Sequence, residues 1–531
     1  MDSPSPPPPL SPISPPSSPT PTSSPLHVSL PEQLEVSTRD QPKEAHLSRF
    51  LISLLHYGGV PSEFFLDLLS RALAEIEARV TDRNVAMKIV KSRGGLDDDE
   101  LELRMLFGKI PLDEPYLQYR LAAMKGERYK DLQEGKIPIS NTYFLRGTAD
   151  PTGTLGPNQV CVILDKGQLS GDVLVYKYPG LHTADICKLQ AICLPEWEEI
   201  VGSSKYGIFF PTVGPYSLAD NNFGGEMYWV SQNSELLKKF SPSSPWPKPE
   251  EDMSKKDEVQ SWPFGELIKN EFEPCYAIGT AADCWLACMD RVLTCNLLGE
   301  EERKTIETKM EQLVNIYYNA LDAAKTGKKV QVPNYLLLDQ YPHFMDQNPK
   351  EKTYHSTSLL GEIYDKVESS KSEKLELIEI RPLPFFTEGV LRSCEDKWEY
   401  HYNNYLREMS QVLICVYGNS SNESDADLKD ISNKACQEVI DKYKEILYGE
   451  GKKLCRSMRP LNEIYEEARA IYKLAYDKAC RSGMVSDCSF AWQVAGEALS
   501  QMYLEGTGRP LIKLNWDLLR VIVRHAPENL F

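Results

Sequence analysis

Apolar positions in the first part of the folded region recur at helical spacing. One such stripe is formed by Phe65, Leu69, Ala72, Ile76 and Val80. A repeat of three or four residues predicts amphipathic helices that bury one face. We therefore expect a helical region over residues 46–130.

The pattern changes to short β-rich runs between residues 136 and 235. Gly and Pro separate four runs, which are QVCVIL (159–164), DVLVYK (172–177), GIFFP (207–211) and MYWVS (227–231). Runs of β-branched and aromatic residues bounded by turn formers are typical of strands. We expect a compact, barrel-like β domain over residues 131–240.

Helical spacing returns after a Pro-, Ser- and charge-rich segment, residues 241–260, which reads as a linker. We expect a helical region over residues 261–390 that packs on the barrel, and a C-terminal helical lobe over residues 391–531. The Pro- and Ser-rich residues 1–45 have little to bury and are expected to be a disordered tail. A binding segment for SH3-like modules is the alternative for this tail. The predicted fold class is α+β.

Composition narrows the class of protein but not its function. The 531 residues suffice for about three domains. No run approaches the about 20 apolar residues of a membrane helix, and no signal-peptide pattern opens the chain. The 13 cysteines are scattered without a CxxC pair, so free thiols are expected rather than a zinc site. The net charge of −18 argues against general phosphate binding but allows a local basic channel.

Three clusters carry candidate chemistry, and the first is GDVLVYKYPGLHTADI, residues 171–186. Alternation along the strand places Val173, Val175 and Lys177 on one face, with the lysine where the strand opens into a turn. A surface lysine whose stem lies along apolar neighbours is the alternative interpretation.

The second cluster is ADNNFGGEMYWVSQN, residues 219–233, which by itself resembles a hairpin turn. The third is KTYHSTSLLGEIYDKV, residues 352–367, which by itself predicts a helix start capped by Ser356 or Thr357. His343 and His355 are 12 residues apart, which is no metal-ligand spacing, so both are expected to serve as hydrogen-bonding groups.

In this order the clusters resemble the cellular, plant-type RNA-dependent RNA polymerases of RNA silencing. That family shows VxVxKxPxxHPGDI, then D-x-D-G-D before x-Y-x-V, then A-x-D-x-x-KTG and Y-x-S-x-S-x-LG-x-IYD. This chain shows VLVYKYPGLHTADI, FGGEMYWV, ALDAAKTGKKVQVP and YHSTSLLGEIYD. The likeness runs from about residue 50 to residue 531. It implies a double-psi β-barrel and an RNA-directed RNA polymerase, a nucleotidyltransferase that makes double-stranded RNA for siRNA production.

The resemblance also implies a Mg²⁺ site made by three acids, the logic of metal-assisted phosphoryl transfer. Aligning Tyr228 and Val230 places the acid positions at Asn222, Gly224 and Glu226. Only Glu226 is anionic, and each missing unit charge is worth about 4 kcal/mol at an effective dielectric near 20. Asp220 is a further candidate ligand if the loop is shifted.

By the same resemblance, RNA or nucleotide phosphates are contacted by Lys177, His182, Asp185 and Lys325. The implied partners are an RNA template, nucleoside triphosphates and other silencing proteins, in the nucleus or the cytoplasm. The family also carries a first barrel before the helical region, whereas only the Pro-rich segment precedes it here. One wall of the family's cleft is therefore expected to be missing.

Three hypotheses remain open. The chain is an active RNA polymerase, or it is an inactive relative that binds RNA or partner proteins as a scaffold. The few acids at the metal positions favour the scaffold, whereas the overall resemblance favours the polymerase. A structural protein unrelated to nucleic acid is the third hypothesis, and the ordered set of motifs argues against it.

Overall fold

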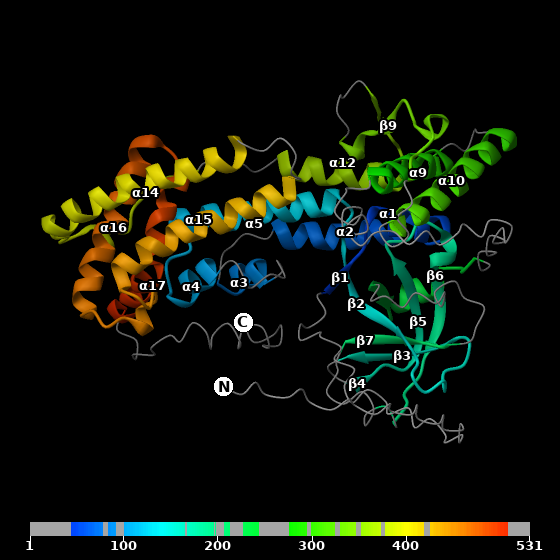
Figure 1. Ribbon diagram of the computed structural model, residues 1–531, viewed down its shortest axis with the longest axis horizontal. Coiled ribbons are helices and arrows are strands. Elements are labelled where there is room, and N and C mark those ends of the chain that lie inside the picture. The colour runs from blue at the N-terminus through cyan, green and yellow to red at the C-terminus, as the bar shows by residue number, and fades with distance from the viewer. Residues whose placement is uncertain are drawn as a thin grey trace, which may run out of the picture.

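The structure is a computed structural model, and it has a β-barrel at one end and a helical lobe at the other (Figure 1). It describes residues 44–77, 83–91, 100–164, 167–195, 197, 206–212, 227–243, 276–294, 299–323, 330–346, 352–372, 378–418 and 425–507. Residues 1–43 of the predicted tail, Val80 and most of the predicted linker lie outside these ranges, whereas the last two residues predicted for the tail belong to a strand. Among the described residues, no helix is both long and apolar enough to cross a membrane.

The N-terminal part of the described chain is helical, as the apolar stripe predicted. A short strand, β1 (Glu44–His46), precedes five helices, which are α1 (Arg49–Tyr57), α2 (Ser62–Glu77), α3 (Arg83–Lys91), α4 (Glu100–Phe107) and α5 (Pro115–Gln133). Phe65, Leu69, Ala72 and Ile76 are buried on one face of α2. The Ser48 hydroxyl accepts the Leu51 N–H and caps α1.

Six strands close into a barrel. Seven strands follow α5, which are β2 (Pro138–Ala149), β3 (Gln159–Leu164), β4 (Gly167–Gln168), β5 (Gly171–Tyr178), β6 (Ile186–Ala191), β7 (Gly207–Phe210) and β8 (Met227–Ser231). The ring runs β2-β7-β3-β6-β5-β8 and closes where β8 pairs with β2, leaving β1 and β4 at its margin. The four predicted strands and the α+β class with a barrel are confirmed.

The rest of the described chain is mainly helical. A short helix, α7 (Ser234–Lys239), leaves the barrel, and α9 (Tyr276–Thr294), α10 (Glu300–Leu321) and α12 (Leu359–Ser372) lie above it (Figure 1). Short strands β9 (Tyr341–Pro342) and β10 (Thr353–Tyr354) pair between α10 and α12. The far lobe contains α13 (Pro384–Thr387), α14 (Arg392–Gly418), α15 (Asp425–Tyr448), α16 (Leu461–Ser482) and α17 (Ser489–Gly506).

Alternation along β5 divides the barrel side chains between two cores. Val173 and Val175 point into the barrel, where they pack with Tyr228 and Val230 of β8. Leu174, Tyr176 and Trp229 point outward, into a larger core shared with the helices. Val173 and Val175 share one face, as the alternation predicted, and this face is the barrel interior, which puts position 177 at the end of the inward row.

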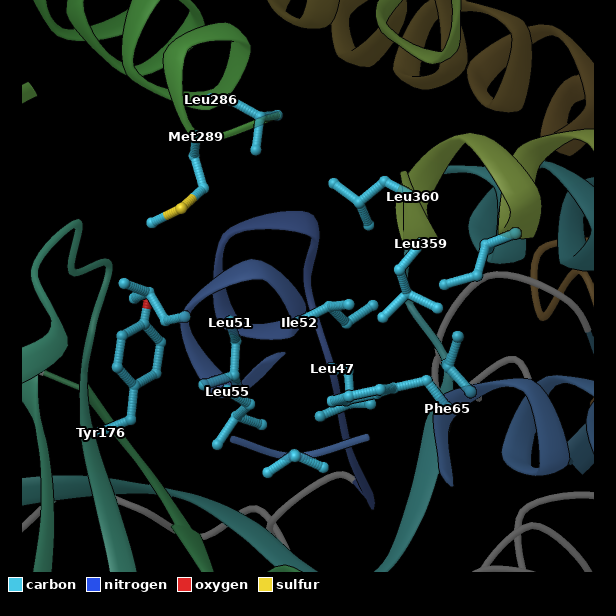
Figure 2. Close-up of a cluster of buried hydrophobic side chains, with 14 of the residues drawn as sticks. Leu47, Leu51, Ile52, Leu55, Phe65, Tyr176, Leu286, Met289, Leu359 and Leu360 are labelled. Atoms are coloured by element: carbon cyan, nitrogen blue, oxygen red, sulfur yellow. The ribbon is translucent and has the colours of Figure 1, made fainter. Parts of the chain in front are cut away.

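Helix α1 is the centre of the larger core. Figure 2 shows Leu51, Ile52 and Leu55 of α1 surrounded by side chains from β5, α9, α12 and α2. These three leucine and isoleucine side chains are at most 1% exposed. Burying each contributes about 1.5–3 kcal/mol relative to exposure, so this packing fixes the barrel against its helical layer.

The predicted helical region over residues 46–130 serves two cores rather than one. Helices α1 and α2 pack with the barrel, whereas α3 and α4 pack with the far lobe. Helix α5 joins the two, because Leu117 and Leu121 lie in the far core while Leu132 lies in the barrel-side core. A sequence stripe shows that a face is buried but not which partner covers it.

Gly147 of β2 is required for the barrel interior to close. A Cβ at this position would overlap the ring of Tyr228 and lie 3.0 Å from the Phe210 ring. We predict that Gly147→Ala lowers the free energy of unfolding by about 1–3 kcal/mol, the usual cost of overpacking a dense core. Chemical denaturation measures this loss.

Gly207→Ala is the matched control, because Gly207 lies on β7 opposite Arg146 and its Cβ would meet nothing closer than 3.5 Å. This control should change stability by less than about 0.5 kcal/mol. Equal effects of the two substitutions would contradict the packing described for Gly147.

Candidate functional site

The Lys177 end of β5 lies at the mouth of the barrel. In the strand register Lys177 faces Tyr228, and Met227, the first residue of β8, lies between Tyr178 of β5 and Arg146 of β2. The first residues of β8 therefore lie beside the Lys177 end of β5. Its predicted acid positions, Asn222, Gly224 and Glu226, and also Asp220, lie outside the described residues, as does Lys325.

A tight turn follows Lys177, with a cis peptide bond between Tyr178 and Pro179. The Tyr176 hydroxyl donates to the Gly180 carbonyl oxygen at 2.7 Å and accepts the Gly180 N–H at 3.0 Å. Gly180 has no room for a side chain, because a Cβ would lie 2.7 Å from the Lys177 carbonyl oxygen. The backbone after Lys177 is therefore closely confined.

A one-turn helix, η1 (Thr183–Asp185), ends this turn with a reciprocal cap. Nδ1 of His182 accepts the Ala184 N–H at 3.0 Å, and the Asp185 carboxylate accepts the His182 N–H at 2.7 Å. Burial lowers the pKa of His182 to about 4, so the imidazole is neutral at pH 7. His182, predicted to contact phosphate, brings no positive charge to the site.

Asp185 faces the protein interior, with 8% of the residue exposed. Burial raises the pKa of Asp185 to about 6, although the hydroxyl of Tyr318, the His182 N–H and the Lys177 ammonium act in the opposite direction. The Tyr318 hydroxyl, on α10, donates to the same carboxylate oxygen as the His182 N–H. Asp185 therefore has hydrogen-bond partners within the protein, and its predicted contact with RNA stays a prediction.

The motif pattern did not reveal Tyr318. It lies 133 residues after Asp185 in the chain. In the sequence of this helix, apolar residues at helical spacing include the neighbouring Tyr317 and predict that it is buried, and Tyr317 is buried. A phenol adjacent to such a stripe carries no sequence signal for a hydrogen bond to a distant carboxylate.

His343, His355 and Asp365 form a second cluster, whose possible ligand atoms all lie within 4.8 Å of one another. The two imidazole rings are stacked at 4.4 Å, and their Nε2 atoms lie 3.0 and 3.1 Å from separate Asp365 oxygens. Nδ1 of His343 accepts the Ser356 N–H at 3.1 Å, so a neutral His343 carries its proton on Nε2 and has no lone pair there for a metal.

The hydrogen bonds of this cluster agree with the structural role predicted for both histidines. Its serines belong to the same network, since Ser356 donates to buried Asp290 of α9 at 2.8 Å. The prediction that Ser356 or Thr357 caps the following helix is wrong. Ser358 accepts the Gly361 N–H instead, because α12 begins at Leu359 and Ser358 is the residue directly before it.

The raised pKa of Asp185 has a consequence for stability. An acid that holds its proton more tightly in the folded chain contributes stability when protonated, and this contribution is lost as pH rises from 3.8 to about 6. The loss amounts to about 3 kcal/mol. We predict that Asp185→Asn removes this part of the pH dependence, as measured by chemical denaturation between about pH 4 and pH 7.

Asp172→Asn is the control, because Asp172 lies nearby in the chain on β5 but is exposed and paired with Lys188. Its stability should follow that of the natural chain across this pH range. A parallel pH dependence in Asp185→Asn and the natural chain would show that Asp185 is not held as described.

Two family models match this chain. The model described as RNA dependent RNA polymerase matches residues 19–367, and the model of the RdRP head domain matches residues 388–513. The solved RNA dependent RNA polymerase QDE-1 from Thielavia terrestris has a similar fold, with a TM-score of 0.50, 15% identity, and coverage of 92% of this chain and 60% of that one.

Plant relatives are more similar in sequence. Probable RNA-dependent RNA polymerase 4 of Oryza sativa subsp. japonica is 44% identical over 89% of this chain and 40% of its own length. Probable RNA-dependent RNA polymerase 3 of Arabidopsis thaliana is 40% identical over 92% of this chain and 49% of its own length. The chain thus spans less than half the length of these relatives. With its barrel, its motifs and a family model over most of its residues, this chain belongs to the RNA-dependent RNA polymerase family.

Proposed function

We propose that this chain takes part in RNA-directed RNA synthesis for siRNA production, with the Lys177 end of the barrel contacting the phosphates of RNA or of an incoming nucleoside triphosphate. The observation that carries the proposal is the placement of Lys177 at the end of the inward-facing row of β5, opposite Tyr228. A lysine ammonium at a barrel mouth is a compact positive charge, and its N–H groups can donate hydrogen bonds to phosphate oxygens. In a chain of net charge −18, such a local cation determines where RNA binds.

The proposed Mg²⁺ site is weakened by its donor set. Asn222 offers a neutral carbonyl oxygen, Gly224 offers no side chain, and Glu226 offers one carboxylate. Mg²⁺ prefers anionic oxygen ligands in strict octahedral geometry, and these three positions do not match a three-carboxylate site. In this proposal, Lys177 holds and orients a phosphate.

The weak donor set of the proposed Mg²⁺ site favours a second function, which is binding without RNA synthesis. A chain that keeps the phosphate-binding lysine but lacks two metal-binding acids would bind RNA, or other silencing proteins, without synthesis. The two functions differ in one measurement, which is template-dependent RNA extension by the purified chain with nucleoside triphosphates and Mg²⁺. Product above a heat-inactivated control supports synthesis, and salt-sensitive RNA binding without product supports the scaffold. The absence of both contradicts the proposal.

Lys177→Ala tests the phosphate contact. We predict about tenfold weaker RNA binding and a salt slope smaller by about one, because one phosphate contact is lost. Filter binding across a salt series measures both quantities. Lys188→Ala is the control, since Lys188 is an exposed lysine of the adjacent strand β6. Equal effects of the two substitutions would contradict a specific role for Lys177.

Restoring the acids tests the weakened site in the opposite direction. We predict that Asn222→Asp combined with Gly224→Asp raises Mg²⁺-dependent extension by at least about tenfold, because two added carboxylates strengthen the hold on a divalent ion. The same pair combined with Glu226→Gln should lose most of this gain. No gain from the restored acids would show that their absence is not what limits synthesis.

A further inference from the structure

Two phenols hold the turn after Lys177 from different sides. Tyr176 of β5 binds both backbone polar groups of Gly180, and Tyr318 of α10 binds the Asp185 carboxylate. The Leu181 N–H also points to the Tyr318 hydroxyl, at 3.4 Å. One hydroxyl of the helical layer thus contacts both the middle and the end of the turn.

The backbone of this turn is closely packed, so it cannot absorb a displacement of one of its residues. A Cβ on Gly180 would lie 2.7 Å from the Lys177 carbonyl oxygen and 2.8 Å from Oδ2 of Asp185. Gly180 is therefore packed between the Lys177 backbone and the Asp185 carboxylate. Because Asp185 also attracts the Lys177 ammonium, a shift of Asp185 changes the surroundings of Lys177 through backbone and charge together.

A carboxylate at this position is unfavourable for stability alone. Burial disfavours its ionised form, and a well-packed apolar residue would avoid that cost. Buried acids with a specific cationic neighbour at the mouth of a site are more typical of function than of packing. Asp185 and its partners therefore point to a functional role rather than to packing alone.

We infer that Tyr318 is a positioning residue, which acts through Asp185 to hold the Lys177 turn in its phosphate-binding arrangement. This inference rests on the proposed function of Lys177. It adds that α10, distant in sequence, is needed for the barrel mouth to bind RNA or nucleotide. Tyr318 itself contacts no substrate in this scheme.

The charged and titratable groups that face Asp185 come from four elements. They are Tyr176 and Lys177 of β5, His182 beside η1, Cys187 of β6, and Tyr317 and Tyr318 of α10. Of these, the Tyr318 hydroxyl is the side-chain donor that lowers the pKa of Asp185. Its removal raises that pKa, so Asp185 is protonated over a wider pH range and attracts Lys177 less.

Tyr318→Phe removes this hydroxyl and keeps the ring. We expect RNA binding about tenfold weaker near pH 6.5 and a smaller deficit near pH 8.5, where Asp185 is ionised again. Tyr317→Phe is the matched control, because Tyr317 is the adjacent buried phenol and no hydrogen bond of its hydroxyl occurs within the described residues. It should bind RNA like the natural chain at both pH values.

Two readouts without RNA separate this inference from the proposed function. Hydrogen–deuterium exchange over residues 176–186 should accelerate in Tyr318→Phe, and acylation of the Lys177 amine, followed by mass spectrometry, should change in rate. Asp185→Asn combined with Tyr318→Phe should add little to either single change, because both act through one contact. If exchange and Lys177 reactivity in Tyr318→Phe match those of Tyr317→Phe, the inference is wrong. If both change but no variant binds RNA, the proposed function is wrong instead.

Discussion

The hydrogen bond from the Tyr318 hydroxyl to the Asp185 carboxylate joins the barrel mouth to the helical layer, and the arrangement of the site depends on it. Without it, the His182 N–H and the Lys177 ammonium would offset less of the cost of burying the Asp185 carboxylate. Tyr318 reaches it because α10 packs along α9, and α9 packs on α1 in the core shown in Figure 2. The placement of Lys177 thus traces back to apolar burial around α1.

The barrel supplies the other half of the arrangement. Its interior is filled by alternate side chains of β5, β8 and their neighbours, and Lys177 occupies the next inward position after Val173 and Val175. Lys177 is partly exposed at this position, so a charged side chain is tolerated at the mouth. Gly147 and Gly180 allow the close approaches that finish the barrel and its turn.

Much of the barrel could be predicted from sequence, because strand patterns are local. The run 227–231 coincides with β8, and alternation assigned Val173 and Val175 to one face. The partners of these elements could not be predicted, since they depend on contacts between distant residues. Periodicity showed a buried face on α10 but not the hydrogen bond of Tyr318. It also predicted one helical region over residues 46–130, although α1 and α4 pack in different cores.

Affinity labelling can measure whether Lys177 is a phosphate-binding lysine. Pyridoxal phosphate carries both an aldehyde and a phosphate, and borohydride reduction fixes it on the lysine amine that it has reached. If Lys177 binds phosphate, it should be labelled more strongly than exposed Lys188 and should be protected by RNA or nucleoside triphosphate. Labelling of Lys177 at the same rate with and without RNA and nucleotide would contradict phosphate binding by Lys177.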